Sequence, residues 1–160
     1  MEGARLATEG DRPICRELLQ VALEGARTMR GGATLVGATT ADELLARWTG
    51  SSTSTSPDEP QAAALFVGEF HEVIVGLAAA VTQPRPLAEH AGRIECLYVE
   101  SEARGVGVGS ALMAAVVAWC REQSCTEVDA LALPGDRSSK QRYEGAGFTA
   151  RLITLSRRWG

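Results

Sequence analysis

The spacing of apolar residues changes character near residue 62. Before that point they recur every three or four positions, as at Ile14, Leu18 and Leu19, which is the period of an amphipathic helix. Asp11 precedes this run as a good N-cap, and Pro13 lies in its first turn. The elements predicted for this part are a short strand over 4–8, a helix over 12–27 that ends before Gly31 and Gly32, and a helix from the Thr40/Ala41 cap through Trp48.

After residue 62 the pattern becomes one of strands interrupted by two helices. The apolar runs are bounded by glycine, proline and charged residues, which is typical of strands. Only Phe70 and His71 separate the first two runs, so we expect a hairpin there. The predicted elements are strands over 64–69, 72–82, 93–99, 126–133 and 148–157, and helices from the glycine-rich stretch to 123 and over 136–146.

Residues 50–60, with the sequence GSSTSTSPDEP, interrupt the periodic pattern. This polar stretch has the composition of a flexible surface loop. Too few residues precede it to build an independent core. We therefore expect a single domain over 1–160, a length at which one domain buries most of its apolar surface.

The charge of the chain limits its partners. A net charge of −4 argues against a general binder of nucleic acid or of anionic membranes. The charge is uneven, because from Arg137 onward there are six basic residues and one acid, Glu144. The basic segment therefore predicts a local site for an anion within an acidic protein.

The sequence also disfavours a membrane span, secretion and metal binding. The longest apolar run, Val73–Val81, has nine residues and is too short to cross a bilayer as a helix. The first residues lack the apolar core of a secretory signal. The four cysteines have no metal-ligand spacing, so we expect reduced structural thiols, no metal and a cytoplasmic protein.

The segment with the clearest chemistry is a glycine-rich turn, Arg104-Gly-Val-Gly-Val-Gly109, between an apolar strand and an amphipathic helix. Glycines let the backbone approach a ligand closely. The N–H groups at a helix N-terminus lie at the positive end of the helix dipole. Such a turn is suited to binding phosphate or pyrophosphate.

Several kinds of binding site contain a glycine-rich turn of this type. A nucleoside-triphosphate loop ends in Gly-Lys-Ser/Thr, and this turn has no lysine. A dinucleotide fingerprint needs a third glycine, where this chain has Ser110, although Glu127 has the offset of its acidic residue. The dinucleotide site and a purely structural turn both stay open at this point.

The pattern Arg104-x-x-Gly107-x-Gly109 resembles the acetyl-CoA loop of the GNAT N-acetyltransferase superfamily. A second segment, DRSSKQRYEGAGF from Asp136 to Phe148, resembles the family's Asn-x-x-Ala-x-x-x-Tyr-x-x-x-Gly-Phe helix. The order of the elements agrees too, so the resemblance covers most of the chain. It implies an α/β fold with a mixed, mostly antiparallel sheet flanked by helices, and an acetyl-CoA cleft between splayed central strands.

The resemblance implies acetyl-CoA as the co-substrate and assigns residues to it. The turn would hold the pyrophosphate through its backbone amides, and the strand before the turn would present main-chain groups to the pantetheine arm. The residues implied are Leu97, Tyr98, Val99, Arg104, Gly105, Val106, Gly107, Val108, Gly109 and Ser110.

Tyr143 is the catalytic residue that the resemblance implies, because a tyrosine at this position of the family protonates the departing thiolate. The alternative is that Tyr143 only packs, or only forms a hydrogen bond to the cofactor sulfur, without transferring a proton. Asp136 and Ser139 replace the family's asparagine and alanine; both are expected to bind the cofactor, and Asp136 is also a good N-cap. Lys140 and Arg137 are expected either to contact the 3′-phosphate of coenzyme A or to lie on a solvated face of the helix.

The general base is less well defined. Glu95 on the strand beside the cofactor is the first candidate, followed by Glu69, His71 and Glu72. The reaction expected is acetyl transfer to a primary amine of a small molecule or peptide. A non-catalytic acyl-CoA sensor and a protein acetyltransferase acting on N-termini or lysines remain as alternatives.

The last residues predict self-association. Many members of the family finish with a two-strand hairpin after Gly-Phe, whereas thirteen residues follow Gly147 here, enough for one strand. An incomplete sheet leaves an edge that another subunit can cover, so we expect a homodimer.

Overall fold

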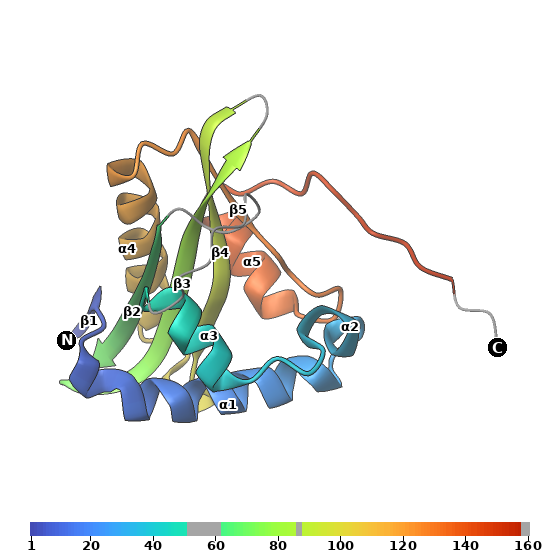
Figure 1. Ribbon diagram of the computed structural model, residues 1–160. Coiled ribbons are helices and arrows are strands. Elements are labelled where there is room, and N and C mark those ends of the chain that lie inside the picture. The colour runs from blue at the N-terminus through green and yellow to red at the C-terminus, as the bar shows by residue number, and fades with distance from the viewer. Residues whose placement is uncertain (51–61, 86–87, 158–160) are drawn as a thin grey trace.

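The computed structural model describes residues 1–50, 62–85 and 88–157 (Figure 1). They form one sheet in the order β1-β2-β3-β4-β5, antiparallel from β1 to β4, with β5 parallel to β4. The mixed, mostly antiparallel sheet predicted from the sequence is confirmed. The strands are β1 (Glu2–Leu6), β2 (Ala63–Phe70), β3 (Val73–Arg85), β4 (Ala88–Val99) and β5 (Glu127–Ala130).

Helices cover both faces of the sheet (Figure 1). One face packs against α1 and α3, and the other packs against α4 and the tyrosine of α5. The helices are α1 (Arg12–Thr28), α2 (Gly32–Val36), α3 (Ala41–Trp48), α4 (Val108–Glu122) and α5 (Arg137–Gly145), with 3-10 turns over Glu9–Asp11 and Ser101–Ala103.

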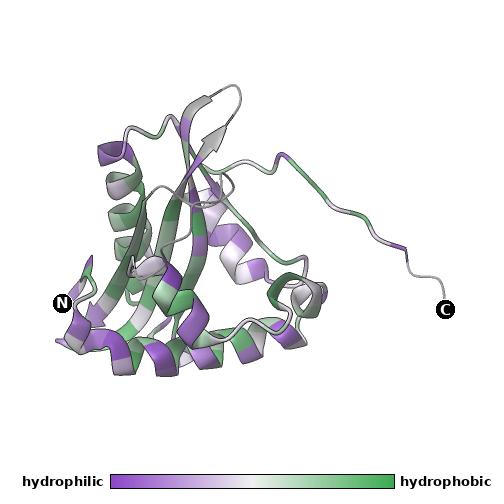
Figure 2. Cartoon of the chain, in the orientation of Figure 1, coloured by the Kyte–Doolittle hydropathy of each residue, from purple (hydrophilic) through white to green (hydrophobic). Residues whose placement is uncertain are grey.

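The core is divided into two layers by the middle of β3. Residues 77–81 are fully buried, and their side chains alternate between the faces. Leu77, Ala79 and Val81 join the α1/α3 layer, whereas Ala78 and Ala80 join the α4 layer. This is the two-residue period of a strand that is covered on both sides. Figure 2 shows the resulting apolar sheet between helices whose outer faces are polar.

The predicted cap of α3 is formed as a capping box. The Glu43 N–H donates to Thr40 Oγ1 at 3.3 Å, and the Thr40 N–H donates to Glu43 Oε2 at 2.8 Å. Each side chain thereby satisfies a backbone donor that the helix start would leave unpaired. The cap fixes where α3 begins, and α3 carries Arg47 and Trp48 toward β4.

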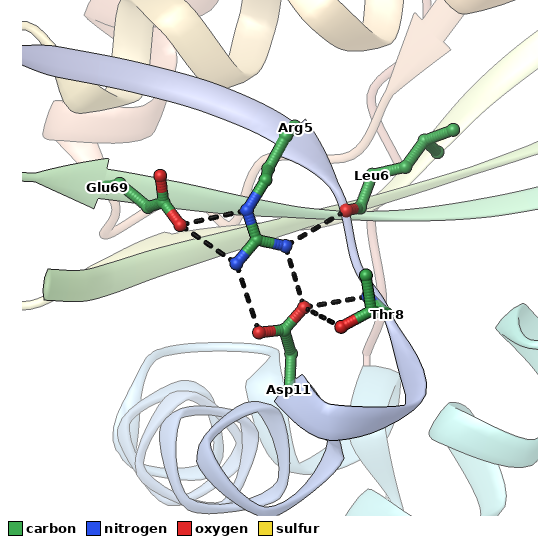
Figure 3. A network of polar contacts seen from close by, with 5 residues as sticks. All are labelled: Arg5, Leu6, Thr8, Asp11 and Glu69. Atoms are coloured by element: carbon green, nitrogen blue, oxygen red, sulfur yellow. Dashed lines mark hydrogen bonds and ion pairs between the residues drawn. The ribbon is translucent and has the colours of Figure 1, made fainter. Parts of the chain in front are cut away.

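Asp11 precedes α1 as predicted, but its carboxylate does not cap that helix (Figure 3). It accepts the Thr8 N–H at 2.7 Å and two bonds from the Arg5 guanidinium, at 2.7 and 3.1 Å. Arg5 also donates to Glu69 of β2 at 2.9 Å. The hydrogen bonds from Arg5, and then those from Thr8, hold the pKa of Asp11 well below its ordinary value. This network ties β1 and β2 to the start of α1.

Several predicted boundaries are corrected by the structure. The strand expected over 148–157 is wrong, because these residues form no ladder and the segment is exposed after Phe148. The strand expected over 126–133 is limited to β5, and the strand expected from 93 already begins at Ala88. The Gly31–Gly32 break opens the short helix α2, which the sequence did not predict. Apart from Gly50, the loop expected over 50–60 lies outside the described residues.

None of the described helices has both the length and the apolar character that a bilayer crossing requires.

Candidate active site

β4 and β5 separate at the middle of β4. Their ladder joins Ala91 to Glu127 and ends with Ile94 opposite Ala130. Beyond Ile94, β4 continues to Val99 and pairs only with β3 among the described residues. The edge of β4 that faces β5 is therefore open over 95–99, as the sequence predicted for splayed central strands. Main-chain donors and acceptors along this edge are free of a strand partner.

A bulge in β4 lies at the point of separation. Ala79 pairs with Cys96 and Ala80 with Ile94, so Glu95 has no partner in β3. A bulge adds one residue on one strand, bends that strand and redirects its side chains. The bulge therefore lies immediately after Ile94, the last residue of β4 that pairs with β5.

The glycine turn follows β4 after the 3-10 turn over Ser101–Ala103. Gly105 and Gly107 have φ of +88° and +96°, a left-handed conformation that other residues rarely adopt. Gly107 is the N-cap of α4, and its carbonyl accepts the N–H groups of Ser110 and Ala111 at 3.0 Å. The amides before Ser110 have no acceptor inside the helix and face outward at its positive end.

A cavity of about 320 Å³ opens at this turn. Most of its wall consists of residues that the sequence assigned to the cofactor. The lining residues are Val99, Ala103, Arg104, Gly105, Gly107, Gly109, Ser110 and Arg142.

Two arginines line the cavity from different elements. Arg104 Nε donates to the carbonyl of Val99 at 3.3 Å, which ties the turn to the end of β4. Arg142 comes from α5 and packs against Gly109, where an added Cβ would lie 3.0 Å from Arg142 Nε. Both guanidinium groups therefore lie beside the start of α4, a favourable place for an anion.

Arg142 was missed in the sequence, which favoured Arg137 and Lys140 as the basic contacts. Lys140 lies 3.7 Å from Glu144, one turn further along α5, and neither Lys140 nor Arg137 lines the cavity. Helical spacing gives no signal for Arg142, because Lys140, three residues before the buried Tyr143, is closer to its face of the helix than Arg142 is. In the structure Lys140 is nevertheless exposed, and Arg142 reaches the turn.

Tyr143 is buried in the α4 layer, with 8% of its surface exposed. Its ring packs against Phe148, with the centroids 5.4 Å apart. Burial raises the pKa of Tyr143 to about 12, and the neighbouring Cys96 thiol adds to this effect. The phenol therefore keeps its proton throughout the neutral range and can act as a proton donor.

Asp136 and Ser139, the two departures from the family motif, bond to each other. Asp136 Oδ1 accepts the Ser139 N–H at 3.0 Å, and its other oxygen accepts the Ser139 hydroxyl. Partial burial favours a higher pKa for Asp136, but the bonds from Ser139 and Ser138 outweigh it and lower that pKa. The N-cap role predicted for Asp136 is confirmed, and neither residue lines the cavity of the turn.

Glu95 lies on the other side of the sheet from the α4 layer. Its carboxylate accepts a bond from Arg47 and another from the Trp48 indole, both at 2.8 Å, and Arg93 lies at 3.8 Å. The structure thus places Glu95 against α3 and does not bring it into the cavity beside Arg104 and Arg142.

The other candidate bases lie at the β1–β2–β3 end of the sheet. Glu69 is paired with Arg5, at 2.8 Å. His71 Nδ1 lies 3.4 Å from the N-terminal amine, and His71 and Glu72 form the β2–β3 turn. None of the three lines the cavity of the glycine turn.

Within the described residues, no group of His, Cys, Asp and Glu side chains is arranged to hold a metal ion. All four cysteines are free thiols, as the sequence predicted.

A family model described as the acetyltransferase (GNAT) family matches residues 37–148, which is more than half of the chain. The chain belongs to the GNAT acetyltransferase family. The matched region of this GNAT chain runs from the loop before α3 through β2–β5 and α4 to Phe148, and so includes both the glycine turn and Tyr143. No curated protein sequence matches the chain.

Solved structures show the same fold. A ribosomal-protein-alanine N-acetyltransferase from Brucella melitensis biovar Abortus 2308 is 19% identical, with a TM-score of 0.69 and full coverage of both chains. A predicted acetyltransferase from Clostridium acetobutylicum, solved with acetyl-CoA, is 15% identical, with a TM-score of 0.68, and the match covers 99% of this chain and 96% of that one. Glucosamine-6-phosphate N-acetyltransferase from Arabidopsis thaliana is 20% identical, with a TM-score of 0.63 and coverage of 100% and 99%.

Proposed function

We propose that this GNAT chain transfers the acetyl group of acetyl-CoA to a primary amine of a small molecule or a peptide, by direct attack of the amine. The observation that carries the proposal is the gap between β4 and β5 beyond Ile94, which leads to a glycine turn lined by two arginines. The gap suits an extended chain such as pantetheine, and the turn suits the pyrophosphate that follows it.

The turn fits a pyrophosphate for three reasons. Its glycines leave room for close approach to the backbone, because a Cβ on Gly109 would meet Arg142 and one on Gly107 would lie 3.1 Å from Glu2 Cγ. The first amides of α4 are donors without an intrahelical acceptor. Arg104 and Arg142 add two positive charges to the wall. We assign the pyrophosphate to these amides and arginines.

The open edge of β4 would hold the pantetheine arm. Main-chain groups of Leu97 and Val99 on this edge have no β5 partner, so they can bond to the amides of the arm. An N–H on the same edge can donate to the thioester oxygen as negative charge develops there. These contacts use the backbone, so the side chains of both residues remain free to pack in the α4 layer.

Tyr143 is assigned as the general acid. Acetyl-CoA, when bound, supplies an activated acyl group and a thiolate as its leaving group. The Tyr143 phenol keeps its proton because burial raises its pKa to about 12, and it packs in the α4 layer near Cys96 of β4. Its hydroxyl is therefore a protonated donor in the layer that borders the gap.

The proton acceptor for the amine is less constrained. Glu95 stays the first candidate, but Arg47 and Trp48 hold its carboxylate at 2.8 Å, so it would act through a water or after this contact opens. Because Arg47 and Trp48 hold this carboxylate, a second candidate function is an acyl-CoA sensor without turnover. Two of the structural neighbours act, by their names, on a protein alanine and on an amino sugar phosphate. The acceptor class is therefore decided by experiment.

The test is a turnover screen with acetyl-CoA over small amines and N-terminal peptides, read as release of free thiol. We expect turnover with at least one amine, and Tyr143→Phe should lower kcat by about 10²-fold with little change in acetyl-CoA affinity. The matched control is Ser138→Ala, which removes an exposed hydroxyl from the same helix and should keep the rate. Tight acetyl-CoA binding without turnover on any acceptor would favour the sensor.

A further inference from the structure

A second cavity, of about 440 Å³, lies at the opposite end of α4 from the glycine turn. The cavity of the turn is lined by Gly109 and Ser110 at the start of the helix, whereas this one is lined by Trp119 in its last turn. The ten positions from Gly109 to Trp119 span roughly 15 Å of helix. The two cavities share no lining residue, and the function proposed above does not use the second.

The second cavity exists because β1 is shorter than β2. The ladder between the two strands ends with Leu6 opposite Phe66, so the first residues of β2, Ala63–Leu65, extend beyond it. The Ala7 N–H makes a last bond to the Leu65 carbonyl at 2.8 Å, and the chain then turns into α1. The start of α1, the end of α3 and the end of α4 enclose the space that is left beside β2.

Most of the wall of this cavity is apolar. Leu45 and Trp48 line it from α3, and Ala64 and Leu65 line it from β2; all four are buried. Trp119 of α4 is half-buried and adds a second aromatic side chain. A cavity of several hundred Å³ with apolar and aromatic walls is typical of a site for a small molecule.

Two hydrogen-bond donors on the wall have no acceptor in the described part of the chain. They are the guanidinium of Arg12, which is half-buried, and the indole N–H of Trp119. The threonine hydroxyls on the wall are already satisfied, because Thr8 donates to Asp11 and Thr49 donates to a carbonyl of α3, both at 2.8 Å. The unmatched groups are therefore both donors, and one of them is a permanent cation.

We propose that this cavity binds a small apolar carboxylate, whose body packs against Trp119 and β2 and whose carboxylate bonds to Arg12. A guanidinium can hold a carboxylate through two parallel hydrogen bonds. Glu9 also lines the cavity, but it is exposed and forms no ion pair with Arg12 in the described structure, so the guanidinium is available. A cationic ligand would be repelled by Arg12, and a neutral one would leave its charge unpaired as the site is desolvated. The inference does not depend on the proposed acetyl transfer.

Calorimetric titration of the full chain with naphthalene-2-acetate and with octanoate gives the first test. Each acid is compared with its own neutral amide, and the two acids distinguish a flat aromatic ligand from an alkyl one. We expect at least one acid to bind, and its amide to bind about tenfold more weakly, the scale of one charged hydrogen bond. Binding of neither acid, or equal binding of acid and amide, would overturn the proposal.

Variants then locate the site. Arg12→Gln should lower the affinity for the acid to that for the amide, and Ala63→Leu, which fills space at the start of β2, should weaken the binding of both. Two controls should bind as wild type: Arg16→Gln removes an exposed guanidinium one turn further along α1, and Arg142→Ala removes one from the other cavity. Thermal unfolding shows that each variant is folded. Undiminished acid binding in Arg12→Gln, or its loss in Arg142→Ala, would contradict the assigned site.

Discussion

Arg142 of α5 lies directly against Gly109 of α4. A Cβ placed on Gly109 would come within 3.0 Å of Arg142 Nε and 3.3 Å of its guanidinium carbon. The absence of a side chain at 109 is therefore what allows a cation from a distant helix to lie at the start of α4. This contact joins the two segments, 104–109 and 136–148, in which the family resemblance was recognised.

Gly109→Ala should separate cofactor binding from stability. Gly109 is helical and has no positive φ, so alanine suits the backbone and should not lower the free energy of unfolding. Its methyl group displaces Arg142, so we expect KM for acetyl-CoA to rise by about tenfold, the scale of one charged hydrogen bond. Steady-state kinetics and thermal unfolding measure the two effects.

The matched control is Gly25→Ala in α1, where an added Cβ meets no atom within 4 Å. It should raise the stability slightly and leave KM unchanged. An unchanged KM in Gly109→Ala as well would show that the position of Arg142 does not contribute to binding.

Burial of Tyr143 predicts a dependence of stability on alkaline pH. Its pKa is about 12 in the folded protein against an ordinary value of 10, so the folded state holds this proton more tightly. The resulting stabilisation is fully present below pH 10 and is lost as pH rises toward 12. Urea unfolding between these values should show a steeper loss in wild type than in Tyr143→Phe, by about 2 kcal/mol at most. If stability falls equally with pH in wild type and in Tyr143→Phe, the raised pKa of Tyr143 is contradicted.

The contact between Glu95 and Arg47 predicts a structural cost for Glu95→Gln. The substitution removes the negative charge that faces Arg47 and Arg93, whose Nε atoms are already buried without a partner. We expect a loss of about 1–3 kcal/mol in the free energy of unfolding. Removing the exposed Arg16–Asp42 pair by Arg16→Ala is the control and should cost less than about 1 kcal/mol.

Glu95→Gln also tests whether Glu95 is the general base. If Glu95 only holds α3 to β4, Arg47→Met/Glu95→Gln should lose no more rate than Arg47→Met alone. A further loss of kcat on adding Glu95→Gln, together with loss of the acid limb of the pH profile, would assign it the proton transfer.

Asp11 should contribute to the loss of folding stability at acid pH. Bonds from Arg5 and Thr8 lower its pKa below the ordinary value of 3.8, so its stabilisation is present above that pH and is lost as the pH falls below it. Asp11→Asn should lower the stability at neutral pH and flatten the acid limb of the curve. The control is Glu9→Gln, an exposed acid in the same 3-10 turn, and an equal effect in both variants would contradict the network in Figure 3.

The elements set by local rules could be predicted from the sequence. The cap at Thr40, the long helices and the hairpin follow from periodicity and turn residues. The five residues of α2 are too few for a helical period to be visible. The strand expected over 148–157 has the right residue types, but a strand also needs a partner edge, and no ladder joins these residues to β5.

For the candidate site, the main-chain features could be predicted from the sequence, but the side-chain contacts could not. The glycine turn follows from its motif, and the gap beside β4 is what the family resemblance implies; both depend on the backbone. The side-chain partners depend on how α3 and α5 pack, which no spacing along the sequence fixes. Arg142 at the turn and the Arg47–Glu95 contact were therefore missed.

The central claim is that the turn at the start of α4, with Arg142, binds the pyrophosphate of acetyl-CoA. Calorimetric titration of wild type and Arg142→Ala with acetyl-CoA and with S-acetylpantetheine, which lacks the pyrophosphate, tests it directly. Arg121→Gln, at the other end of α4, is the matched loss of charge. We predict that Arg142→Ala weakens acetyl-CoA binding by about tenfold and leaves S-acetylpantetheine binding unchanged. Equal losses for both ligands, or no loss for either, would contradict the account.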